Sequence, residues 1–127
     1  MSASPSRGHR AALLAVVPLV IVGLVTPAQS ETGKSVMNSA ALLRDGRVQF
    51  IQSKMLLPTY DVFDEGRYFA PARQQHLVEV RGQRIALTIC EDMWNDKNFW
   101  AAQANGPLYS VDPVETLFQQ EIGRAHV

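Results

Sequence analysis

Residues 84–94 read RIALTICEDMW, and this stretch decides how the rest of the chain is interpreted. An apolar, partly β-branched run over residues 84–89 stops at Cys90, and the acidic pair Glu91 and Asp92 follows at once. Such a run predicts a buried strand that ends at an exposed thiol, and strand ends are where α/β sheets place chemistry. Cys90 is therefore a candidate nucleophile, with a core cysteine that acts as a small hydrophobe as the alternative.

Length and composition limit the class of protein. The chain has 127 residues, 46% of them hydrophobic and 19% charged, which predicts at most one globular domain with a modest core. Its 12 basic and 12 acidic residues balance without a basic cluster, so the sequence carries neither a nucleic-acid footprint nor a polybasic membrane patch. A single cysteine excludes an intrachain disulfide, and His9, His76 and His126 lack the spacing of metal ligands. We expect the three histidines on the surface and no metal site.

The N-terminal region imitates a secretory signal. Two arginines precede an apolar run over residues 11–25, and residues 28–30 fit a small-x-small cleavage site, so secretion is one alternative. The run is shorter than the roughly 20 residues needed to span a bilayer. We favour a split at Pro18 into a helix over residues 10–17 and a buried strand over residues 19–25, because the following strands need this one as a neighbour. The expected location is then the cytoplasm.

Residues 28–35, AQSETGKS, fit the loose form of a phosphate-binding loop. Such a loop needs a glycine-rich turn that opens a helix, and only Gly33 is available here. Residues 37–44 and 47–51 instead flank Asp45-Gly46, a pair typical of a hairpin turn. We therefore expect a loop and a hairpin, and a phosphate-binding module remains an alternative.

The remaining elements follow from periodicity and turn residues. Alternation over residues 48–53 places Lys54 at a strand end, and prolines and glycines mark an irregular segment that ends at Pro71. Strands over residues 76–80 and 84–89, joined by a tight turn at 81–83, then present Cys90 at the rim of a sheet.

A helix is expected near the end of the chain. Asp112 and Pro113 are suited to its N-cap and first turn, and it should cover residues 113–120.

Two longer motifs carry a resemblance to a known family. Residues 54–69, KMLLPTYDVFDEGRYF, and residues 89–94, ICEDMW, resemble the nitrilase (carbon-nitrogen hydrolase) superfamily, and more closely the glutaminase domain of glutamine-dependent NAD synthetases. The resemblance covers about residues 19–120. It implies an α/β fold, an incomplete four-layer α-β-β-α sandwich, with a partial domain over residues 1–120. Residues 121–127 look like a translated sequencing-library adapter and are expected to be a non-native tail.

The resemblance also implies roles for particular residues. Cys90 would be the nucleophile and Lys54 would stabilise the oxyanion. Tyr60 and Glu91 would line the glutamine pocket, with Glu91 facing the substrate ammonium, and Glu65 would be a second, supporting carboxylate. The alternatives are an exposed strand-end lysine, a packed tyrosine and solvated turn carboxylates. Trp94 would be either pocket wall or core.

The family's general base is a glutamate well before the lysine. Only Glu31 precedes Lys54, and its surroundings do not match the family's glutamate segment, so we assign no base in this chain and expect it to be inactive alone. We also expect exposed apolar surface and sheet edges, and hence aggregation.

The implied partners are glutamine and, in the intact enzyme, deamido-NAD. ATP and Mg²⁺ would belong to a separate synthetase domain, with no cofactor in this one. A homo-oligomer is expected for the intact protein. A free-standing amidase and a secreted, non-catalytic binding domain are the alternatives.

Overall fold

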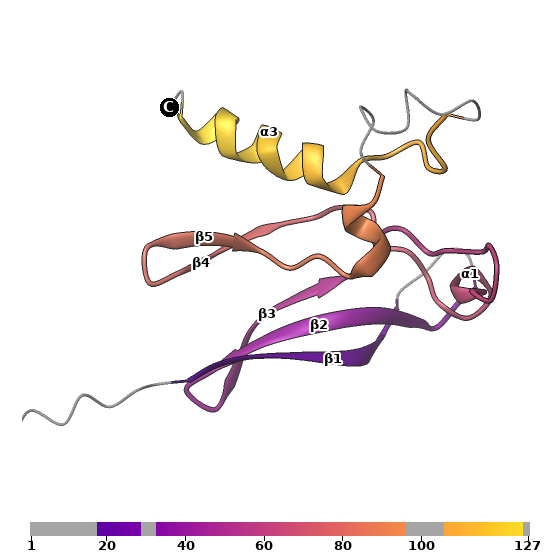
Figure 1. Cartoon of the computed structure of the whole chain (residues 1–127). Helices are drawn as coiled ribbons and strands as arrows, with labels where there is room; N and C mark the ends of the chain where they lie inside the picture. The colour runs from indigo at the N-terminus through magenta and orange to yellow at the C-terminus, as the bar shows by residue number, and fades with distance from the viewer. Residues whose placement is uncertain (1–17, 29–32, 96–105, 126–127) are drawn as a thin grey trace, which may run out of the picture.

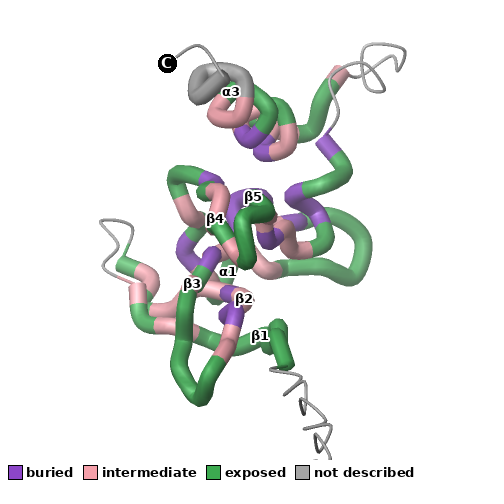
Figure 2. Tube along the Cα trace, turned by 90° about the vertical axis from the view of Figure 1, so that its left-hand side faces the viewer, coloured by how far each residue is buried: buried purple, intermediate pink, exposed green. Residues whose placement is uncertain are grey.

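The structure is a computed structural model that describes residues 18–28, 33–95 and 106–125. These residues form a three-stranded sheet, a two-stranded sheet and short helical segments. In Figures 1 and 2 the three-stranded sheet lies at one end, helix α3 at the other, and the two-stranded sheet between them. The predicted α/β class is therefore confirmed.

The first sheet contains β1 (Leu19–Pro27), β2 (Val36–Arg44) and β3 (Arg47–Ser53), all antiparallel in the order β1-β2-β3. The turn between β2 and β3 has Asp45 at φ 55° and Gly46 at φ 70°. Positive φ at both central residues matches the twist of a two-residue hairpin, which is why an Asp-Gly pair occurs here. The predicted hairpin is confirmed.

Strand β1 lies where the sequence predicts a strand, but the prediction that it is buried is wrong. Eight of its nine residues are exposed, Ile21 at 56% and Val25 at 60% among them. Figure 2 shows this strand coloured as exposed over most of its length. The reason is that β1 packs chiefly against its neighbour β2 among the described elements, and no other described element covers its side chains. The expectation of exposed apolar surface is confirmed at this strand.

The connection between β1 and β2 does not lead into a helix. The Ala28 N–H donates to the Ser35 carbonyl over 2.8 Å, and β2 begins at Val36. Residues 28–35 thus link two antiparallel strands. The phosphate-binding alternative loses the helix on which it depends.

The second sheet pairs β4 (Leu77–Val80) with β5 (Gln83–Ala86). The expected turn at 81–83 is one residue shorter, because Arg81 and Gly82 alone adopt positive φ, 52° and 74°. The expected strand over residues 84–89 is also too long. It leaves the ladder after Ala86, and the Ile89 N–H is instead hydrogen-bonded to the side chain of Asp92 at 3.3 Å.

Helix α3 (Pro113–Ala125) begins as predicted. The Asp112 carboxylate accepts from the N–H groups of Val114 and Glu115 over 3.0 and 3.1 Å, which makes it the N-cap. The helix continues five residues beyond the predicted end at 120, because helical hydrogen bonding does not need an apolar periodicity. Glu121 forms an ion pair with Arg84 of β5, which ties α3 to the second sheet.

The buried apolar residues join these layers: Ala41, Leu42, Met55, Leu56, Ala70, Leu87 and Leu117. His76 is exposed, as expected. The predicted helix over residues 10–17, His9, Glu31 and His126 lie outside the described residues. Within the described ranges, no helix is long and apolar enough to cross a membrane.

Candidate functional site

Lys54 lies directly after β3, as predicted, but it is not exposed. Its backbone N–H donates to the Asn38 carbonyl and its own carbonyl accepts from Ala72, both over 2.8 Å. The residue is only 1% exposed, and its ammonium Nζ lies 2.7 Å from the Glu65 Oε1 atom. The alternative of a solvated strand-end lysine is therefore wrong.

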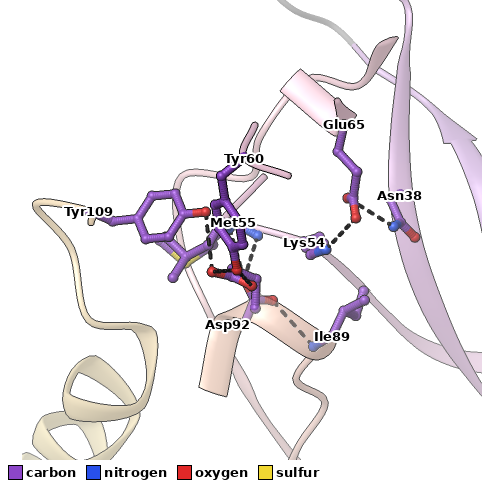
Figure 3. A network of polar contacts seen from close by, with 10 residues as sticks. Asn38, Lys54, Met55, Tyr60, Glu65, Ile89, Asp92 and Tyr109 are labelled. Atoms are coloured by element: carbon purple, nitrogen blue, oxygen red, sulfur yellow. Dashed lines mark hydrogen bonds and ion pairs between the residues drawn. The ribbon is translucent and has the colours of Figure 1, made fainter. Parts of the chain in front are cut away.

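Glu65 is the partner that makes this burial tolerable. It opens the short helix α1 (Glu65–Tyr68), and its other oxygen, Oε2, accepts from the Asn38 side-chain amide at 3.4 Å. Its side chain is 22% exposed, so it connects the buried ammonium to the surface. A buried charge without such a partner would be strongly destabilising. Figure 3 shows Glu65 between Lys54 and Asn38.

Cys90 begins a short 3-10 helix, η1 (Cys90–Met93), and is exposed. Its φ is +47°, a left-handed conformation that costs a non-glycine residue about 1–3 kcal/mol. Two backbone hydrogen bonds close the turn, from Asp92 N–H to the Ile89 carbonyl and from Trp94 N–H to the Glu91 carbonyl. The chain thus makes a strained turn at the cysteine, after the extended residues 87–89. Cys90 is exposed, as predicted, but it lies in this turn and not at the end of a strand, because β5 ends at Ala86.

Glu91 is enclosed by two tyrosines. It is 6% exposed, and the Tyr60 hydroxyl donates toward both of its oxygens, at 2.8 and 2.9 Å. The Tyr109 hydroxyl lies 3.4 Å from one of them. The solvated-carboxylate alternative is therefore wrong for Glu91. Both hydroxyl donors are uncharged, so neither forms an ion pair with Glu91.

The two phenols stay protonated at neutral pH. The hydrogen bond to Glu91 is the main cause that raises the pKa of Tyr60, followed by burial and by the nearby charges of Glu91, Cys90 and Asp61. Burial raises the pKa of Tyr109, and the charge of Glu91 raises it further. Both hydroxyls therefore remain donors to Glu91. Tyr109 is not singled out by the sequence, because it lies in the segment before α3 and belongs to neither motif.

Asp92 is fully buried, at 0% exposure, and uses both carboxylate oxygens. One oxygen accepts from the backbone N–H groups of Met55 and Leu56, at 3.0 and 2.8 Å. The other accepts from the Gln75 side-chain amide at 3.0 Å and from the Ile89 N–H at 3.3 Å. Figure 3 shows Asp92 beside Met55 and Ile89, with Lys54 close by.

Burial raises the pKa of Asp92, and this effect outweighs the hydrogen bonds from Leu56, Ile89 and Met55 and the charge of Lys54, which lower it. The sequence places Asp92 in the cysteine motif without a role. Its partners are 36 and 37 residues away along the chain, and no local pattern reveals them.

Four of the five predicted site residues thus form two side-chain pairs, Lys54 with Glu65 and Tyr60 with Glu91, and Cys90 belongs to neither pair. Trp94 is 66% exposed, so it is not a core residue. Among the described residues, no group of three or more His, Cys, Asp or Glu side chains could hold a metal ion.

Comparisons with known proteins agree with the resemblance of the two motifs. No family model matches the chain. A glutamine-dependent NAD(+) synthetase from Synechocystis is 42% identical over 106 residues, which cover 81% of this chain and 18% of that protein. The enzyme of the same name from Acinetobacter baylyi is 45% identical over 67 residues, covering 53% of this chain and 12% of that protein.

A solved structure of an enzyme with the same name is also similar to this chain. The glutamine-dependent NAD+ synthetase from Acinetobacter baumannii, solved in complex with adenosine diphosphate, is 39% identical with a TM-score of 0.52, over 60% of this chain and 14% of that one. The resemblance to glutamine-dependent NAD(+) synthetases is therefore confirmed. The chain corresponds to about a fifth of the length of the Synechocystis relative.

Proposed function

We propose that this chain is part of the glutamine-hydrolysing unit of a glutamine-dependent NAD(+) synthetase, and that it acts in the cytoplasm. The observation that carries the proposal is the burial of Lys54 against Glu65 in a segment that hydrogen bonds join to the turn exposing Cys90. The similarity to synthetases from several bacteria supports it. In this reading the unit belongs to a four-layer α-β-β-α sandwich, of which the described residues form one part.

The proposed reaction begins with the Cys90 thiolate attacking the side-chain amide carbon of glutamine. A sulfur-carbon bond forms, and the carbonyl oxygen becomes an oxyanion. The carbon-nitrogen bond then breaks, the departing nitrogen takes a proton from a general acid, and ammonia leaves a thioester. Water gives a proton back to that proton carrier as its oxygen attacks the thioester carbon, the sulfur-carbon bond breaks, and the thiolate and glutamate are released, the carboxyl proton passing to solvent.

Lys54 supplies positive charge for the oxyanion. A fixed ammonium in a site shielded from water stabilises developing negative charge more strongly than one in bulk solvent. Glu65 and the backbone bonds to Asn38 and Ala72 hold this lysine in place before substrate arrives. Glu65 is thus the supporting carboxylate of the site.

Glu91 recognises the α-ammonium of glutamine. It is nearly buried, and its tyrosine donors carry no charge, so an ammonium group in front of it would gain a charge-assisted hydrogen bond. Tyr60 orients the carboxylate and forms part of the pocket wall.

The proton carrier of this mechanism is not assigned to a residue of this chain. General acid-base catalysis contributes about 10²- to 10⁴-fold, so we expect the 127-residue chain alone to form the thioester slowly and to turn over poorly.

The ammonia would pass to an ATP- and Mg²⁺-using synthetase unit that amidates deamido-NAD, in an intact, homo-oligomeric enzyme. No step above uses those groups.

A glutamine-like electrophile tests the proposal on the chain as it exists. A diazoketone analogue of glutamine should alkylate Cys90 faster than its counterpart without the α-amino group, and the C90S variant should not be labelled. Excess glutamine should slow the labelling. Excess glutaramate, which is glutamine without its α-amino group, should not. Equal rates with both reagents, read by mass spectrometry, would contradict a glutamine site.

A further inference from the structure

We propose that Asp92 is a positioning residue that fixes Lys54 and Cys90 relative to each other by binding the backbone beside each of them. This inference rests on the proposed function, because it assigns those two residues to one reaction. Asp92 itself touches neither the substrate nor the reacting atoms.

The first support is where its hydrogen-bond donors lie. Met55 and Leu56 are the two residues directly after Lys54, and their N–H groups bind Oδ1 of Asp92 at 3.0 and 2.8 Å. Ile89 is the residue directly before Cys90, and its N–H binds Oδ2 at 3.3 Å. A single carboxyl group therefore ties together the segments that carry the lysine and the cysteine.

The second support is the chemistry of the donor set. Four N–H groups converge on Asp92, and a carboxylate is the side chain of this size that only accepts. A fully buried charge of this kind is kept only where its hydrogen bonds are made. Gln75 extends the arrangement to α3, because its backbone carbonyl accepts from the Gln120 side-chain amide at 2.7 Å.

The third support is the strain at Cys90. A left-handed φ at a residue with a side chain persists only where neighbouring contacts over-determine the conformation. The bond from the Ile89 N–H to Asp92 is next to this strained residue, and it holds the chain as it enters the turn. Asp92 therefore acts on Cys90 through the backbone.

The D92N variant separates the two sides of this tie. Its amide oxygen can still accept from Met55 and Leu56. Its NH₂ group can donate to Gln75, because the Gln75 Oε1 atom is buried without a partner and that amide can turn over. Among the backbone donors, only the Ile89 N–H is then left without an acceptor. D92N should thus keep the hydrogen bonds from Met55 and Leu56, beside Lys54, and lose the one from Ile89, beside Cys90.

The test combines hydrogen exchange with thiol labelling on the full 127-residue chain. In the wild type the Met55, Leu56 and Ile89 amides should all be protected. In D92N the Ile89 amide should exchange about tenfold faster or more, as expected for a buried donor that loses its acceptor, while Met55 and Leu56 keep their protection. D45N is the matched control, since it makes the same chemical change in an exposed hairpin turn.

The same variants are then labelled at Cys90. D92N should lose about tenfold in its preference for the diazoketone analogue of glutamine over iodoacetamide, and D45N should not. Unchanged Ile89 protection and unchanged preference in D92N would overturn the proposal. Loss of protection throughout the chain would also overturn it, because Asp92 would then serve general stability.

The exchange result is independent of the glutamine site. If the wild type shows no preference for the diazoketone, the proposed function fails. Faster exchange of the Ile89 amide alone in D92N would still support the positioning role of Asp92. If the wild-type Ile89 amide exchanges without protection, the positioning role of Asp92 is wrong.

Discussion

Replacing Tyr60 by phenylalanine removes one hydroxyl and leaves the ring. That hydroxyl donates to Glu91 at 2.8 and 2.9 Å, closer than the Tyr109 hydroxyl at 3.4 Å. Glu91 is 6% exposed, so water can replace the lost donor only in part. The Y60F variant should therefore misplace the carboxylate that we assign to the substrate ammonium.

The expected size follows from the strength of this bond. A hydrogen bond to a charged group contributes about 1.5–3 kcal/mol, and the lower end applies because Tyr60 itself is 43% exposed and Tyr109 remains in place. At about 1.4 kcal/mol for each factor of ten, Y60F should lose about tenfold in reaction with a glutamine-like reagent.

The assay compares two labels at the single cysteine. The second-order rate constants for Cys90 with the diazoketone analogue of glutamine and with iodoacetamide are measured by mass spectrometry at low protein concentration. Only the first reagent carries the α-ammonium, so only its rate should fall in Y60F. Y68F is the matched control, because Tyr68 is 64% exposed and outside the proposed site.

Two results would contradict this role of Tyr60. A diazoketone rate in Y60F within about twofold of the wild type would mean that Tyr60 does not organise a pocket. An equal loss with both reagents would mean that the hydroxyl affects the thiol or the fold rather than recognition of the ammonium.

Three further predictions concern stability and association. Because burial raises the pKa of Asp92, the folded chain binds this proton more tightly than the unfolded chain. Its contribution to stability is present below the unfolded pKa of about 3.9 and is lost as the pH rises through the raised value. The free energy of unfolding of the wild type relative to D92N, measured by urea titration, should therefore fall as the pH rises across that range. A difference that stays constant with pH would contradict this. The I21K variant places a charge on the exposed edge strand β1 and should increase the monomer fraction in size-exclusion chromatography, whereas V62K, at a site 84% exposed and outside the sheets, should not; equal behaviour of the two variants would argue against association through β1. The D112A variant removes the N-cap of α3 and should cost about 1 kcal/mol, seen as faster hydrogen exchange of the Val114 and Glu115 amides, and unchanged exchange there would rule out the cap.

Local chemistry explains which elements can be predicted from the sequence. The hairpin at Asp45-Gly46 and the start of α3 at Asp112 depend on residues that determine their own turn or cap, and both occur where expected. The position of Lys54 at a strand end follows from alternation in β3. The motifs also identify Glu65 and Glu91 as carboxylates of interest.

The features that the sequence does not reveal depend on distant partners. Lys54 is buried because Glu65, 11 residues away, pairs with it. The strand before Cys90 ends early because the Ile89 N–H binds Asp92 and not another strand. Burial of β1 cannot be inferred from its apolar composition, since burial depends on what covers the strand.

The most direct test of the central claim places the chain in a complete enzyme. The segment of the Synechocystis synthetase that matches this chain is replaced by the matching residues of this chain, and release of glutamate from glutamine is measured. We expect the chimera to hydrolyse glutamine, and its C90S and K54M variants to fold but not to hydrolyse glutamine. A chimera that folds like its parent yet releases no glutamate, or one whose activity survives the loss of Cys90, would contradict the claim that these residues form a glutamine-hydrolysing site.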